Sequence, residues 1–185
     1  MEPLAEQEYV PIPPQEWVYV LHPRPVLVVV AGSSLERYSA MPASWATPVS
    51  RDPPIVAVAV APKRYTYQMI LEAKEFALCL LPADMLEAID CLGSISGRNV
   101  RDKLAYCKLE KAKARRVKAP IIAGSLAVLE CTLWKIVEAG DHNLVLGQVV
   151  EAYRQKDYNT CPQNKPIPLH VCKDYYTQPG KPQQA

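Results

Sequence analysis

The chain has 185 residues, of which 49% are hydrophobic and 22% charged, and its 21 basic residues nearly balance 19 acidic ones. This length suits one folded domain, and 18 prolines, roughly twice the usual share of ~5%, argue against an all-helical bundle. The apolar stretches at 25–32 and 53–62 are about half of the ~20 residues that a membrane-spanning helix needs. We therefore expect a soluble, cytoplasmic protein with no membrane partner.

Runs of β-branched and aromatic residues, bounded by proline, glycine or polar clusters, predict most of the regular structure as strands. The expected strands are 16–21, 25–31, 43–49, 55–61, 76–81, 125–138 and 143–153. Helical periodicity predicts short helices at 66–74 and 84–91, and a third that follows Asn99, whose side chain would cap it. The proline-rich ends, 1–15 and 154–185, are expected to be extended. The pattern favours a mainly β fold, a barrel or sandwich with short inserted helices.

The segment 55–61 separates large side chains from small ones. As successive side chains of a strand point to opposite sides, one face carries Val56, Val58 and Val60 and the other carries Ile55, Ala57, Ala59 and Ala61. The small face can pack in the core or admit a second sheet, a partner subunit or a flat ligand.

Cysteines, glycines and histidines exclude several kinds of site. The six cysteines form no CxxC pair, so neither a disulfide framework nor a structural zinc site is indicated: Cys79, Cys91, Cys107, Cys131, Cys161 and Cys172. We expect most to be buried as small hydrophobic residues, and a bridge between Cys161 and Cys172 stays open. The seven glycines form neither GxGxxG nor a P-loop, and three histidines offer no local metal-binding spacing.

Three polar segments are candidates for a binding site. Lys63 to Thr66 enter a predicted helix, where two cations lie at its positive N-terminal end, so a bound phosphate would resolve the repulsion; a solvated turn is the alternative. The loop Gly93 to Asn99 supplies hydroxyls and a guanidinium, although many helix connections look similar. In Ala40 to Ser50, small residues would let a planar ring approach the backbone. Trp45 is expected more often in a core or interface than as a stacking partner.

The run Lys108 to Lys118 holds six cations and one acid. No aromatic residues are interleaved with it and the total charge is nearly balanced, so we expect a solvated face and no nucleic-acid partner.

Four segments, in this order, resemble one family: PASWATPVSRDPPIVAVAV, KRYTYQMI, GSISGRNVRDKL and AGDHNLVLGQVVEA. The chain is similar over about 20–153 to the flavin reductase-like family of FMN-binding split barrels, which includes flavoredoxins and archaeal ferric reductases. The resemblance implies a Greek-key split β-barrel in a single domain 1–185, with an N-terminal arm 1–15, a barrel core 20–153 and a tail 154–185. It also implies a homodimer with flavin near the subunit interface.

By position, the family's ring-facing strand matches Ala43, Ser44, Trp45, Ala46, Thr47 and Ser50. Its phosphate-holding turn matches Lys63, Arg64, Tyr65 and Thr66, and its second polar loop matches Ser96, Gly97, Arg98 and Asn99. His142 matches a histidine that lies near the nicotinamide in flavin-reducing relatives and would position the hydride donor, with a structural hydrogen-bonding role as the alternative.

The expected function is therefore that of an FMN-binding oxidoreductase that passes electrons from NAD(P)H through flavin to free flavin, ferric iron or a protein acceptor, with no metal site. Two alternatives remain. One is an FMN-binding electron carrier without nicotinamide turnover, and the other is a non-catalytic dimeric interaction module.

Overall fold

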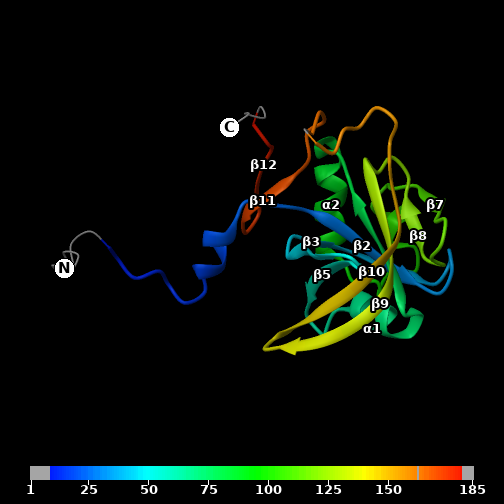
Figure 1. Cartoon of the computed structure of the whole chain (residues 1–185), viewed down its shortest axis with the longest axis horizontal. Coiled ribbons are helices and arrows are strands. Elements are labelled where there is room, and N and C mark those ends of the chain that lie inside the picture. The colour runs from blue at the N-terminus through cyan, green and yellow to red at the C-terminus, as the bar shows by residue number, and fades with distance from the viewer. Residues whose placement is uncertain (1–8, 162, 181–185) are drawn as a thin grey trace.

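The computed structural model describes residues 9–161 and 163–180, and most of its regular structure is antiparallel β-sheet (Figure 1). Seven strands form one sheet in the order β3-β2-β6-β9-β10-β5-β4. Their bounds are Leu27–Gly32 (β2), Tyr38–Ala43 (β3), Ala46–Arg51 (β4), Pro54–Val60 (β5), Glu75–Leu80 (β6), Ala127–Ala139 (β9) and His142–Arg154 (β10). The mainly β class predicted from the sequence is confirmed.

The two edge strands of this sheet, β3 and β4, are consecutive in the chain. Only Ser44 and Trp45 separate them, and the Trp45 carbonyl accepts a hydrogen bond of 2.9 Å from the Ala59 amide of β5. β3 and β5 also contact each other, so the sheet curls toward a barrel. The prediction of one strand over 43–49 was wrong at this point, because a corner at Ser44 and Trp45 divides the segment.

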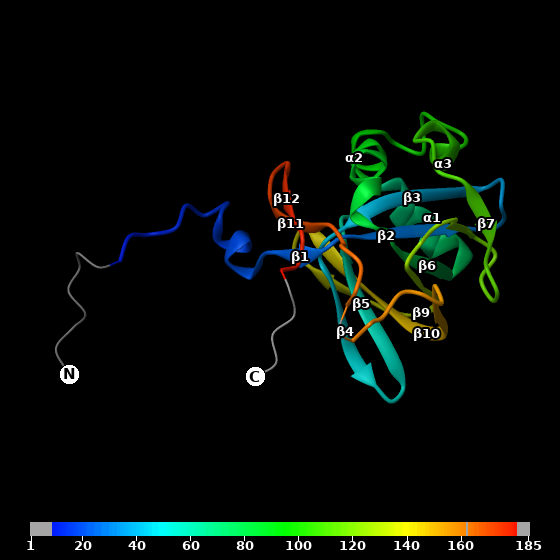
Figure 2. The same ribbon diagram turned by 90° about the horizontal axis from the view of Figure 1, so that it is seen from above.

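Three helices pack against the strands: α1 (Tyr65–Ala73), α2 (Leu86–Ser94), which a 3₁₀ turn η2 (Ala83–Met85) precedes, and α3 (Lys103–Tyr106). In Figure 2, α2 and α3 lie on the same side as β3, with β7 (Lys111–Lys113) nearby; β7 pairs with β8 (Pro120–Ile122). The helices predicted at 66–74 and 84–91 are confirmed. The cap of the third helix was assigned wrongly, because Asp102, not Asn99, accepts the hydrogen bond from the Ala105 amide.

Apolar side chains form two main clusters. Val56, Val58 and Val60 of β5 are buried in one of them, together with Phe76 and Val145. The other lies under α2 and α3 and is built on Val28, Val30 and their neighbours. The large face of 55–61 is therefore core, whereas its small face lines the surface hollows described below.

Two segments near the ends of the chain differ from the expectation, while residues 1–8 of the predicted N-terminal arm lie outside the described residues. The segment predicted as a strand at 16–21 is a 3₁₀ helix, η1 (Trp17–Leu21), which has no buried residue and pairs with none of the sheets. The predicted extended tail contains a hairpin, β11 (Leu169–Cys172) and β12 (Tyr175–Thr177), which pairs with β1 (Arg24–Pro25). No helix within the described ranges is long and apolar enough to cross a membrane.

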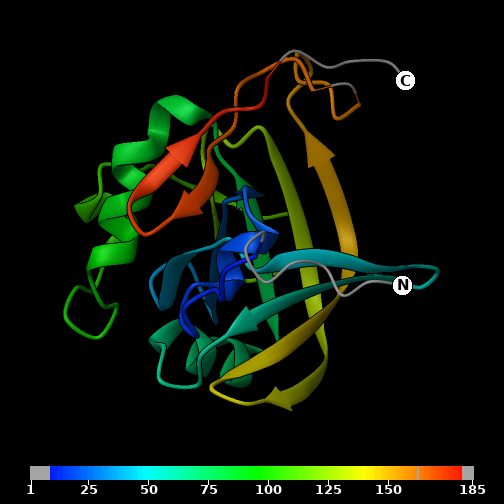
Figure 3. The same ribbon diagram turned by 90° about the vertical axis from the view of Figure 1, so that its left-hand side faces the viewer.

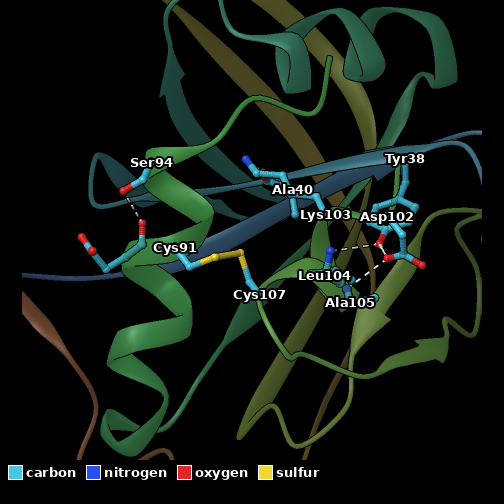
Figure 4. Close-up of a disulfide and its surroundings, with 10 residues drawn as sticks. Tyr38, Ala40, Cys91, Ser94, Asp102, Lys103, Leu104, Ala105 and Cys107 are labelled. Atoms are coloured by element: carbon cyan, nitrogen blue, oxygen red, sulfur yellow. Dashed lines mark hydrogen bonds between the residues drawn. A yellow bond between two sulfur atoms is a disulfide. The ribbon is translucent and has the colours of Figure 1, made fainter. Parts of the chain in front are cut away.

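One disulfide corrects the expectation about the cysteines. Cys91 of α2 is joined to Cys107, which follows α3 (Figure 4). The chain folds back between these helices and brings two cysteines 16 positions apart to a Cα separation of 5.7 Å. Cys161 and Cys172 are free, so the bridge left open for them does not form.

Candidate functional site

A cleft of about 290 Å³ opens between β3, the start of α1 and the loop after α2. Two of the predicted segments line this polar cleft, namely Lys63 to Thr66 and the loop residues Ser96 and Gly97. No aspartate or glutamate lies among its lining residues. The structure thus brings together two polar loops that the sequence separates by about 30 positions.

The start of α1 concentrates positive charge at the polar cleft. Arg64 is the N-cap residue, its side chain makes no capping hydrogen bond, and the first turn contains no acidic residue. The unpaired N–H groups of a helix N-terminus carry about half a positive charge, so nothing in the first turn of α1 offsets the charges of Lys63 and Arg64. The arrangement favours an anionic ligand.

The wall of the polar cleft is closely packed. The Thr66 and Ser39 hydroxyl oxygens lie 2.9 Å apart and are buried. A Cβ atom on Gly97 would approach Ser39 Oγ to 2.7 Å and the Tyr65 ring to 2.9 Å. The loop therefore approaches β3 and α1 so closely that only glycine fits at this position.

Lys103 is a cleft residue that the sequence analysis missed. It lies at the start of α3, is buried, and donates a hydrogen bond of 2.6 Å to the Ala40 carbonyl of β3 (Figure 4). Desolvation, and then the positive charge of Arg64, lower the pKa of Lys103 to about 8. Recognising Asp102 as the helix cap would have placed Lys103 at the first helical position, but no local signal places that helix beside the cleft.

The neighbouring carboxylate does not neutralise Lys103. Asp102 accepts hydrogen bonds from Tyr38 at 2.5 Å and from Lys111 at 2.8 Å. Burial would raise the pKa of Asp102, but the hydrogen bonds from Lys111 and Tyr38 outweigh it and lower the pKa to about 2. The polar cleft is therefore lined by Lys63, Arg64 and Lys103 and by no aspartate or glutamate.

A second hollow of about 170 Å³, here called the Trp45 hollow, adjoins the polar cleft. The two share Met41, Pro42 and Arg64. The predicted residues that line it are Ala43, Ser44, Trp45 and His142, beside the small face of β5. Together the two spaces fall within the ~300–1,000 Å³ of small-molecule sites.

His142 lies at the rim of the Trp45 hollow at the start of β10. Its ring centroid is 5.0 Å from that of Trp45, and its Nδ1 is 2.8 Å from the Asp141 carboxylate. The Asp141 contact orients the imidazole, and the side chain is still 30% exposed. The ring is thus both held in place and accessible.

Not every predicted residue lies in these two spaces. Ala46 and Thr47 line a separate apolar space of about 230 Å³, the outer hollow, and Trp45 borders both it and the Trp45 hollow. Ser50 lines none of these spaces; it pairs with Ile55 near the β4–β5 turn.

The end of the second polar loop also lies outside the cleft. Asn99 is exposed, and its backbone N–H donates a hydrogen bond to the Ser96 carbonyl. Arg98 lies over the Tyr65 ring at 5.2 Å and donates to the Lys63 carbonyl at 3.3 Å. Arg98 therefore ties the two loops together at the edge of the cleft rather than lining it.

Comparison with known proteins identifies the fold. The model of the flavin reductase-like domain family matches residues 19–177. The chain belongs to this family. A protein of Aeropyrum pernix is 37% identical over 139 residues, which are 75% of this chain and 52% of that relative, so the match spans about half of its length. An NADH-dependent FAD reductase of Streptomyces globisporus is 32% identical over 132 residues, or 71% of this chain and 70% of the relative.

The crystal structure of an FMN-binding protein from Thermus thermophilus superposes on this flavin reductase-like chain with a TM-score of 0.83 at 29% identity, covering 96% of this chain and 98% of the other. The split-barrel fold that the sequence resemblance implied is therefore confirmed.

Proposed function

We propose that the protein binds FMN across the polar cleft and the Trp45 hollow and acts as an NAD(P)H-dependent reductase of the flavin reductase type. The observation that carries this proposal is the set of three cations, Lys63, Arg64 and Lys103, which converge on one cleft without a facing carboxylate. Family membership and the similarity to an NADH-dependent FAD reductase support the reaction type.

The residues present fit a flavin phosphate. A charged lysine that is 4% exposed and has no acidic partner is costly, as the lowered pKa of Lys103 indicates. A phosphate dianion would stabilise the charged form of Lys103. The Arg64 guanidinium and the free amides at the start of α1 would donate hydrogen bonds to the phosphate oxygens. The small residues Ala43, Ala59 and Ala61 around the Trp45 hollow leave room for a flat ring.

When bound, the flavin supplies the redox chemistry, taking up a hydride from a nicotinamide nucleotide and releasing electrons to free flavin, ferric iron or a protein acceptor. The protein itself would position the cofactor and the hydride donor. The polar cleft holds the phosphate end, and Trp45 and Ser44 border the ring end. His142, oriented by Asp141 and still accessible at the rim, would position the nicotinamide donor.

We also propose that the chain, as one flavin reductase-like domain, forms a homodimer through the outer hollow. Apolar side chains at its border are strongly exposed, with Trp17 at 58% and Leu21 at 57%. The small face of β5, with Ala57 and Ala59, forms its floor. A second copy would cover this apolar surface. Light scattering that returns the monomer mass of 20.6 kDa would refute the dimer.

The visible spectrum of freshly purified protein, before and after anaerobic addition of NADH, tests cofactor and donor together. We expect a flavin spectrum that bleaches with NADH or NADPH. Bound flavin that stays oxidised with both nucleotides would favour the alternative of an electron carrier. Protein that takes up no FMN would favour the alternative of an interaction module.

A variant with Lys63→Ala and Arg64→Ala tests the phosphate end. We expect its affinity for FMN to fall at least about tenfold, since two charge-assisted contacts are lost. The matched control removes two exposed lysines of the β7–β8 region, Lys113→Ala and Lys118→Ala, and should bind FMN as the wild type does. Unchanged affinity in the Lys63/Arg64 variant would refute the phosphate assignment.

A further inference from the structure

The C-terminal hairpin reaches the candidate site through His170 of β11. His170 Nδ1 lies 3.2 Å from the hydroxyl oxygen of Ser44, which lines the Trp45 hollow. His170 Nε2 lies 2.9 Å from the backbone carbonyl of Lys173 in the hairpin turn. Figure 3 shows this hairpin beside the N-terminal segment that contains β1, with which β11 pairs. The segment predicted as an extended tail thus contacts the ring end of the site.

These two contacts determine which atom carries the proton. A carbonyl oxygen only accepts hydrogen bonds, so Nε2 of His170 must be the protonated nitrogen that donates to Lys173. In a neutral imidazole the other nitrogen, Nδ1, then has a lone pair and accepts. With a neutral ring, Ser44 donates its hydroxyl proton to His170, and the remaining lone pairs of its oxygen are free to accept.

The His170 ring is held in this orientation from several sides. His22 Nδ1 donates to the His170 carbonyl at 3.0 Å, and the two rings meet edge to face with centroids 4.9 Å apart. The Tyr176 ring of β12 lies 5.4 Å away on the same hairpin. A flipped ring would lose the Lys173 contact, so the hydrogen-bond direction at Ser44 is fixed in advance of ligand binding.

We propose that His170 is a positioning residue of the flavin site, which holds the Ser44 hydroxyl so that its oxygen accepts a hydrogen bond from a ring N–H of the bound flavin. The proposal rests on the proposed flavin-binding function. A hydroxyl on its own rotates and either donates or accepts. The contact with His170 removes the donor option and pre-organises Ser44 for a ligand that presents an N–H group.

Two substitutions of His170 separate its two contacts. In His170→Gln the longer amide reaches the Nε2 position and still donates to Lys173, but Ser44 loses its acceptor. In His170→Asn the shorter amide places its oxygen near the Nδ1 position and still accepts from Ser44. We expect His170→Gln to weaken binding of FMN and of riboflavin equally, by about fivefold, the worth of one hydrogen bond, and His170→Asn to recover most of this loss. Tyr175→Phe, at an exposed position of the same hairpin, is the control.

Ser44→Ala completes a double-mutant cycle. If His170 acts through Ser44, the Ser44→Ala variant should lose about as much affinity as His170→Gln, and the double variant should lose no more than either single one. Additive losses, or a His170→Gln variant that binds riboflavin as the wild type does, would overturn the proposal.

Nitrogen NMR of the flavin-free protein tests the geometry independently. We expect His170 to be the Nε2–H tautomer, with an Nδ1 resonance that shifts in Ser44→Ala but not in Tyr175→Phe. An Nδ1–H tautomer would refute the positioning role even if flavin binds. Wild-type protein with the expected tautomer but no affinity for any flavin would instead refute the proposed function, and the ring contact with it.

Discussion

Replacing Lys103 with methionine should weaken FMN binding and yet stabilise the flavin-free protein. The pKa of Lys103 is lowered from 10.5 to about 8, mainly because the side chain is desolvated. A shift of this size means that keeping the charge in the folded protein costs about 3 kcal/mol. Methionine removes that cost but leaves the Ala40 carbonyl without its ammonium donor, which offsets about 1–2 kcal/mol. We expect a net gain of about 1–2 kcal/mol in the free energy of unfolding below pH 8.

The direction of the pKa shift sets the pH dependence of stability. Between pH 8 and 10.5 the unfolded chain still binds the Lys103 proton, whereas the folded protein has released it. The free energy of unfolding therefore rises with pH across this window in the wild type. Urea unfolding at pH 6.5 and 9.5 should show a smaller rise in Lys103→Met. Lys113→Met, an exposed position on β7, should keep the wild-type profile.

FMN binding should show the opposite pH trend. Above pH 8, Lys103 must take up a proton when FMN binds, because the phosphate interacts with the charged lysine. The Kd for FMN should therefore rise up to about tenfold per pH unit. Riboflavin, which has no phosphate, should show no such trend, and Lys103→Met should abolish it for FMN. Fluorescence titration measures both ligands. FMN affinity that is independent of pH in the wild type, or equal losses for FMN and riboflavin in Lys103→Met, would refute the reasoning.

Three other perturbations test the close packing at Gly97, the disulfide and the buried carboxylate of Glu130. Gly97→Ala should raise the Kd for FMN, since the new Cβ must displace the loop, whereas Gly93→Ala meets its nearest neighbour at an ordinary 3.4 Å and should not. Removing the disulfide with Cys91→Ser and Cys107→Ser should lower the free energy of unfolding by about 3 kcal/mol, because the bond closes a loop of 16 residues. Glu130→Gln should cost roughly 2–3 kcal/mol in urea unfolding, since the buried carboxylate accepts three backbone amides and one hydroxyl.

Each of these predictions has a result that contradicts it. Equal FMN affinities of the two alanine variants would show that the Gly97 loop yields without cost. A thermal midpoint that does not change when the wild type is reduced would contradict the role of the disulfide. For Glu130, burial would raise the pKa, but hydrogen bonds from Arg115, Tyr153 and their neighbours outweigh it and lower the pKa. Stability should thus fall in the wild type as the pH drops through that lowered value, and should not do so in Glu130→Gln.

The barrel strands were predictable because local composition decides them. Runs such as 55–61 and 143–153 are rich in Val, Ile, Leu or aromatic residues, and the structure has strands there within one or two residues. The same composition failed at 16–21, since a strand needs a neighbour and the partner of a strand is not encoded in its own sequence. The hairpin at the C-terminus was missed for the same reason, as it forms only against β1.

The candidate site was predictable where adjacent residues make it and not where the fold assembles it. The cations at Lys63 and Arg64 stand out because they precede a helix. Lys103 and His170 reach the same region from distant segments, and neither carries a local signal of its position. The pairing of Cys91 with Cys107 likewise depends on how α2 and α3 fold back on each other.

The wall between the Trp45 hollow and the outer hollow is only one layer of residues thick. Trp45 and Ala59 border both spaces, so a group that fills one of them presses on side chains that shape the other. Cofactor loading and subunit association, as proposed above, would then be thermodynamically linked, with each changing the affinity of the other by the same factor. Titrations of flavin would accordingly depend on protein concentration.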